Sequence, residues 1–106
     1  MRAHWVRKMS EWERLRNGIE IKRLARDDAR NIQMDLLRIA PGLNDAPHWH
    51  DDWEWVYILE GDLTDEKGVH RKGDFLINRK DAKHQPTSKS GCTLICVWCG
   101  SVRQGP

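Results

Sequence analysis

Two histidines and a glutamate at even spacing are the feature that most constrains how this chain folds. His48, His50 and Glu54 are separated by two and four positions. Val56 and Ile58 continue the series with apolar side chains. Because residues two apart in a β-strand point to the same face, this spacing predicts strands whose inward face carries polar groups and then apolar ones. Imidazole suits zinc, copper, iron and nickel, and a carboxylate adds a hard anionic ligand, so the pattern predicts a metal site.

A fourth ligand has to come from another part of the chain, and His4, His70 and His84 are the remaining histidines. His70 lies in a highly charged turn and His4 in the polar N-terminus, whereas His84 follows an apolar run and a short loop. A neighbouring strand would bring His84 beside His48. A lone H-x-H is usually an ordinary polar pair, but burying three imidazoles and a carboxylate without an ion is costly. The predicted set for one divalent ion (Fe, Zn, Mn or Ni) is His48, His50, Glu54 and His84.

The rest of the chain shows short strand signals separated by turn residues. Strands are predicted at about 19–24, 32–40, 48–59, 75–77 and 93–98, with turns at 17–18, 41–42, 60–62, 72–74 and 90–91. We find no long amphipathic helix and no internal repeat. This pattern predicts an all-β sandwich or barrel. A length of 106 residues fits one domain, divided into an N-terminal arm (1–18), a barrel (19–100) and a C-terminal tail (101–106).

Composition excludes several classes of partner. Charged residues make up 32% of the chain, the net charge is +2, and acids interleave with bases, as between Arg23 and Arg30. We therefore expect no nucleic-acid surface, which would gather basic charge on one face. No apolar run approaches the roughly 20 residues that span a membrane, and the basic start lacks the apolar stretch of a secretion signal. Three cysteines cannot all pair, which favours a reduced, cytoplasmic protein.

The motif as a whole resembles the cupin superfamily. The first cupin motif matches at every defining position, which are Gly42, His48, His50, Glu54 and Gly61. The second matches in part: Gly73, Asp74 and His84 agree with it. Arg79 and Asp81 replace its proline and glycine, and Ser88 replaces its asparagine. The resemblance implies a single-domain double-stranded β-helix, or jelly-roll barrel.

Two further segments narrow the resemblance to the ChrR-type cupin group. They are LEGDLTDEKGVHRKGDFLINR (59–79) and GCTLICV (91–97). The group includes anti-sigma factor domains and acetylacetone-dioxygenase-like enzymes. The resemblance therefore implies a small metalloenzyme, dioxygenase-like, acting on a chelating oxygenated small molecule. The alternatives are a non-catalytic sensor that binds a metal or a ligand, and a structural barrel with a vestigial site.

Aromatic residues occupy the odd positions of the same segment, opposite to the metal face. They are Trp49, Trp53, Trp55 and Tyr57. In a regular strand they point out of the barrel, where Trp5 or Trp12 could cover them. Large exposed apolar patches usually mark contact surfaces, and interfaces are enriched in aromatic residues, so we expect a homodimer.

Four other residues raise questions about function. Cys96 and Cys99 are three apart, so on a strand their thiols diverge, and structural cysteines are favoured over a redox or zinc pair. Cys92 and Cys96 share a face, and one of the two is expected near the cavity. Arg38 is expected to be a solvated charge at the rim, and the alternative is that it reaches the barrel interior, because it shares a face with Met34 and Leu36.

Overall fold

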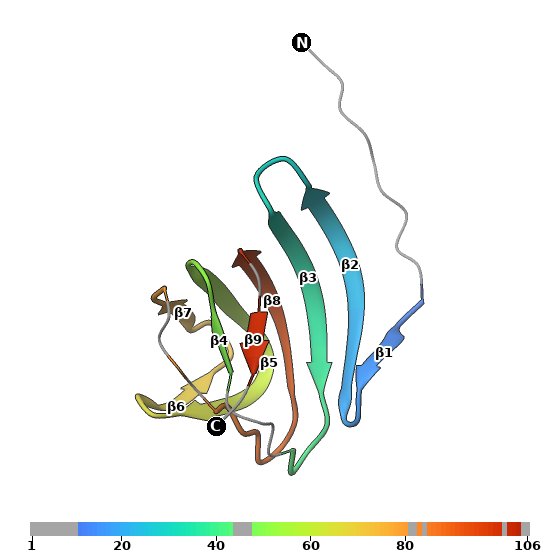
Figure 1. Cartoon of the computed structure of the whole chain (residues 1–106). Helices are drawn as coiled ribbons and strands as arrows, with labels where there is room; N and C mark the ends of the chain where they lie inside the picture. The colour runs from blue at the N-terminus through green and yellow to red at the C-terminus, as the bar shows by residue number, and fades with distance from the viewer. Residues whose placement is uncertain (1–10, 44–47, 81–82, 84, 101, 105–106) are drawn as a thin grey trace.

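The computed structural model describes residues 11–43, 48–80, 83, 85–100 and 102–104, with 49, 50 and 102–104 described by their backbone only. The strands in this part of the chain are β1 (Glu13–Arg16), β2 (Ile19–Asp27), β3 (Ile32–Ile39), β4 (His48–His50), β5 (Glu54–Asp65), β6 (Gly68–Arg71), β7 (Phe75–Asn78), β8 (Cys92–Cys99) and β9 (Val102–Gln104) (Figure 1). Among the described residues, no helix has the length and apolar character needed to cross a bilayer. The all-β prediction is confirmed.

Seven strands form one curved antiparallel sheet. Its order is β1-β2-β3-β8-β5-β6, and β7 pairs with the other half of β5. A second, two-stranded sheet joins β4 to β9. In Figure 1, β8 runs between β3 and β5, although more than fifty residues separate it from β3 in the sequence. This crossover places residues of β8 directly beside the candidate ligand strand.

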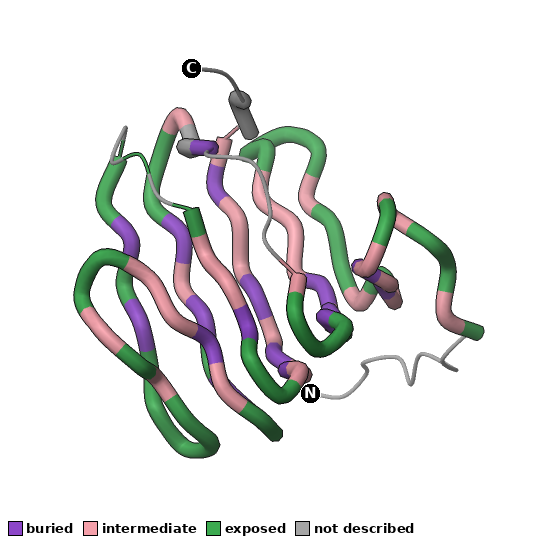
Figure 2. Tube along the Cα trace, turned by 90° about the horizontal axis from the view of Figure 1, so that it is seen from below, coloured by how far each residue is buried: buried purple, intermediate pink, exposed green. Residues whose placement is uncertain are grey.

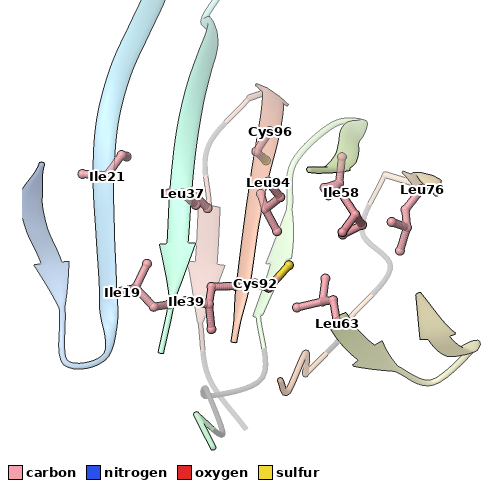
Figure 3. Close-up of a cluster of buried hydrophobic side chains, with 11 residues drawn as sticks. Ile19, Ile21, Leu37, Ile39, Ile58, Leu63, Leu76, Cys92, Leu94 and Cys96 are labelled. Carbon is pink, nitrogen blue, oxygen red and sulfur yellow. The ribbon is translucent and has the colours of Figure 1, made fainter. Parts of the chain in front are cut away.

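The concave side of the sheet is apolar at one end. Leu37, Leu94 and Ile58 lie in one register row across β3, β8 and β5. The buried cluster around them is completed by Ile19, Ile21, Ile39, Val56, Leu63, Leu76, Cys92 and Cys96 (Figure 3). Buried and exposed stretches alternate along the strands in Figure 2, as period-two patterning requires. Ile21 and Ile58 are 1% and 0% exposed, so this layer is the core.

Strand β5 differs from the sequence prediction at its centre. A turn was predicted at 60–62, but one strand runs from Glu54 to Asp65. A register shift between Ile58 and Glu60 marks a bulge against β8, and Gly61 adopts a positive φ of 81°. A bulge of this kind bends a strand without ending it. The predicted turn is therefore wrong, because Gly61 serves a bend inside the strand.

The two ends of the described chain also contribute strands that the sequence did not predict. β1 pairs with β2 through Glu13 and Ile21, and β9 pairs with β4 through Gln104 and His48. Within the predicted C-terminal tail (101–106), residues 102–104 are extended and paired with β4.

The outward face of β5 and β7 carries the predicted aromatic surface. Tyr57 pairs with Phe75 and Trp55 with Ile77 across the two strands. Tyr57, Phe75 and Ile77 are 43%, 58% and 45% exposed. Trp53 is also exposed, whereas the side chain of Trp49 lies outside the described part. The predicted outward orientation is thus confirmed for Trp53 and Tyr57.

Arg38 does not reach the interior. Its guanidinium is 2.8 Å from a carboxylate oxygen of Glu20 and lies over the Trp12 ring, 4.2 Å from the ring centroid. The buried positions of β3 are Asp35, Leu37 and Ile39, so the odd-numbered face is the inner one. The alternative for Arg38, a place in the interior, is wrong. Both faces of this strand carry apolar residues, and alternation alone does not show which face is covered.

Candidate metal centre

The barrel interior turns polar at the end opposite to the apolar layer. The register places one residue from each of four strands in a row, namely Gln33 (β3), Trp98 (β8), Glu54 (β5) and Asn78 (β7). The next row inward holds Asp35, Cys96, Val56 and Leu76. Polar groups therefore collect in two adjacent rows, while the rows beyond them are apolar. This polar end contains Glu54, one of the four predicted ligands.

Glu54 is buried and its carboxylate is held from two sides. It is the first residue of β5 and is 5% exposed. The side-chain amide of Asn78 donates to Oε1 at 2.7 Å, and the thiol of Cys96 donates to Oε2 at 3.1 Å. Both donors are themselves buried. A carboxylate fixed in this way presents its remaining lone pairs in a defined direction, which a metal ligand needs.

His48 is the second described member of the predicted set. It opens β4 and is 8% exposed. His50 is the last residue of the same strand; its side chain lies outside the described part. His84 also lies outside the described residues. Within the described part, no group of three or more His, Cys, Asp or Glu side chains is disposed to hold a metal.

The donor chemistry of the described pair fits a metal. One imidazole and one carboxylate, both buried, are the ligand types that first-row divalent ions accept. His70, the described histidine left out of the set, has its Nε2 2.8 Å from Oδ1 of Asp65. It is therefore already engaged on β6, as its charged surroundings in the sequence indicated.

Asp35 is a buried acid at this end that the sequence did not single out. It is 1% exposed, and its Oδ2 accepts a hydrogen bond of 2.7 Å from the Gln33 amide. Arg26 in turn donates to Gln33 at 2.8 Å. Burial raises the pKa of the Asp35 carboxyl, against the opposing effects of Gln33, Arg23 and Arg26. The available signal was an acidic residue on the same strand face as Leu37 and Ile39.

All three cysteines are free and buried. Cys96 and Cys92 point into the core together (Figure 3), as their even spacing predicted. Burial raises the pKa of the Cys92 thiol to about 12. Burial, and then the charge of Glu54, raise the pKa of Cys96 well above its ordinary value. Thiols in this state are poor nucleophiles, which argues against a nucleophilic or redox role for Cys92 and Cys96.

Comparison with protein families gives one match. A model of the family described as "ChrR Cupin-like domain" matches residues 2–102. No curated protein sequence matches the chain.

Solved structures show the same fold. An acetylacetone dioxygenase from Acinetobacter johnsonii superposes with a TM-score of 0.88 at 12% identity, covering 100% of this chain and 80% of that one. An RmlC-like cupin from Ralstonia eutropha JMP134 gives 0.79 at 19% identity, with 87% and 64% covered. A chain of the complex between Rhodobacter sphaeroides SigE and the anti-sigma ChrR gives 0.74 at 23%, with 84% and 48% covered. This chain therefore spans less than two thirds of the length of the Ralstonia and Rhodobacter chains.

Proposed function

The chain belongs to the ChrR cupin-like domain family, and from this premise we propose that it binds one divalent transition metal through His48, His50, Glu54 and His84. The observation that carries the proposal is the state of Glu54. It is buried at the polar end of an otherwise apolar interior, with a donor from a different strand on each carboxylate oxygen. Such a carboxylate is placed to act as a ligand.

The residues of the chain have separate tasks in this proposal. His48, His50, Glu54 and His84 bind the ion, and Asn78 holds Oε1 of Glu54. The apolar layer around Ile58 excludes water on the side of the site that faces the core. When bound, the metal supplies Lewis acidity to a chelating ligand.

For the activity, we favour a dioxygenase-like enzyme acting on a small oxygenated chelator such as a β-diketone. Support comes from the fold, which the chain shares over its whole length with a structure of an acetylacetone dioxygenase. The second candidate is a non-catalytic metal or ligand sensor. It is favoured by the two donors on Glu54, because a carboxylate held on both oxygens suits a rigid, closed site.

One experiment separates the candidates. Protein loaded without oxygen with Fe(II), Zn(II), Mn(II) or Ni(II) is expected to retain about one ion per chain, and the Fe(II) form to consume oxygen with acetylacetone. Oxygen-electrode traces and elemental analysis are the measurements. One ion without turnover on β-diketones would favour the sensor. Protein that retains no ion under any loading would overturn the metal proposal and leave a structural barrel.

We also propose that a second copy of the chain covers the outer aromatic face. Trp55, Tyr57, Phe75 and Ile77 are direct cross-strand neighbours and form a continuous apolar surface. The neighbouring outward residues Ile95 and Val97 of β8 extend it, since they pair with Tyr57 and Trp55. A patch repeated on both copies can pair with itself about a two-fold axis.

The dimer prediction is tested with a matched pair of variants. Phe75→Glu places a charge in the patch at its most exposed residue, and light scattering is expected to show that a dimer becomes a monomer. Val69→Glu is the control, because Val69 is 50% exposed but lies on β6, outside the patch. Wild-type protein that stays monomeric at a concentration about 100 times a micromolar dissociation constant would contradict the proposal.

A further inference from the structure

Cys96 makes a contact that packing alone does not require. It lies on β8, 1% exposed, opposite Asp35 on one side and Val56 on the other. Instead of contacting only apolar neighbours, its Sγ lies 3.1 Å from Oε2 of Glu54. Cys96 pairs with Val56, but its thiol contacts Glu54, which lies two residues before Val56 on β5.

The direction of this contact follows from the groups around the sulfur. The indole N–H of Trp98, two residues further on β8, donates to Sγ. Indole is only a donor and an ionised carboxylate only an acceptor, so the S–H proton of Cys96 points to Glu54. Trp98, Cys96 and Glu54 therefore form a short chain of donors that ends on the carboxylate.

Asn78 completes the arrangement from the other side. Its amide is 2.7 Å from Oε1, and it lies on β7 in the same register row as Glu54. The two oxygens of Glu54 thus receive one donor from β7 and one from β8, the two strands that flank this end of β5. A swing of the carboxylate away from this place would break both contacts and leave buried donors unpaired, which is costly.

We propose that Cys96 is a positioning residue for the metal centre: its thiol holds Oε2 of Glu54 and, together with Asn78, keeps the carboxylate in place as a ligand instead of a mobile base. The inference rests on the proposed function, since it takes Glu54 to be a metal ligand. It assigns a role in the site to one cysteine out of three.

The chain contains a matched control. Cys92 lies on the same strand and the same face, is 3% exposed, and sits at the other end of the core in Figure 3. Substituting either cysteine by alanine removes one buried Sγ atom. Only Cys96 contacts Glu54 among the described cysteines, so a difference between the two variants reports on that contact.

The test uses Co(II) as the probe, with affinity measured by chelator competition and geometry by the visible absorption spectrum. Loss of a residue that hydrogen-bonds to a metal ligand typically weakens metal binding by about 10- to 100-fold. For Cys96→Ala we expect a loss of Co(II) affinity of this size and a shifted cobalt absorption band. Cys92→Ala should match the wild-type protein in both. Cys96→Ser, which restores a donor, should recover affinity to within a few-fold.

The outcomes separate this inference from the proposed function. Wild-type protein that fails to bind Co(II) would overturn both. Wild-type binding together with equal affinity and an equal spectrum for Cys96→Ala would overturn only the positioning role. If Cys96→Ala does not fold, the infrared S–H stretch of the wild-type protein, assigned by difference from Cys96→Ser, decides the question. It should shift when Co(II) binds, and an unchanged S–H stretch would contradict the contact.

Discussion

Glu54→Gln is expected to abolish stoichiometric metal binding, although it changes the side chain by a single group. The substitution keeps the volume of a residue that is 5% exposed, so packing is largely preserved. It removes the negative charge and turns one ligand oxygen into an amide. Losing a residue that hydrogen-bonds to a metal ligand already weakens metal binding by about 10- to 100-fold. Losing a ligand itself should therefore weaken it by more than about 100-fold. Elemental analysis after dialysis against free metal measures the effect.

His48→Ala should behave in the same way, and His70→Ala provides the control. His48 is buried at the start of β4, whereas His70 is engaged by Asp65 on β6. His70→Ala is therefore expected to keep one ion per chain. If Glu54→Gln retains the metal at wild-type affinity, the ion binds at a place that does not include Glu54.

The same variants should lose the thermal stabilisation that the metal provides. At a free metal concentration about 100 times Kd, binding to the folded state alone adds about 2.7 kcal/mol. For a domain of this size, each kcal/mol raises Tm by roughly 4–8 °C. A metal-dependent rise in Tm for wild-type protein and for His70→Ala, but not for Glu54→Gln, is thus the expected pattern in differential scanning calorimetry.

The alternation of the central segment was predictable from sequence because it depends only on strand geometry. Glu54, Val56 and Ile58 are all buried, at 5%, 4% and 0% exposure, as even spacing required. The partners of Glu54 were not predictable in the same way. Cys96 is 42 residues away, and it meets Glu54 only because β8 inserts between β3 and β5. Such non-local pairing leaves no signature in local periodicity.

Errors arose where one local signal has two structural meanings. A glycine between acidic residues at 60–62 fits a turn and equally fits a bulge, and only the contact with the start of β8 selects the bulge. On β3, both faces carry apolar residues, so the sequence allowed an alternative in which Arg38 reaches the interior. The structure instead buries Asp35 there, with Gln33 as its hydrogen-bond donor.

The two glycines of the first motif allow a final prediction about stability. Gly42 and Gly61 have almost equal φ values of 80° and 81°, a region that costs an L-residue about 1–2 kcal/mol. Their surroundings differ. A Cβ at Gly42 would meet nothing within 4 Å, whereas at Gly61 it would lie 1.9 Å from the backbone oxygen of Gly91. That oxygen also accepts the backbone N–H of Asp62 at 3.0 Å.

Gly42→Ala is therefore expected to cost only the backbone strain, and Gly61→Ala that strain plus displacement of the chain entering β8. We expect the second variant to lose roughly 3 kcal/mol or more, the range of severe backbone defects, which is a large part of the 5–15 kcal/mol of a typical domain. Urea unfolding followed by tryptophan fluorescence compares the two. Equal losses would mean that β5 and β8 do not depend on this close approach, and that Gly61, like Gly42, serves only the backbone angle. A greater loss for Gly61→Ala would tie the motif glycine to the register that brings Cys96 to Glu54.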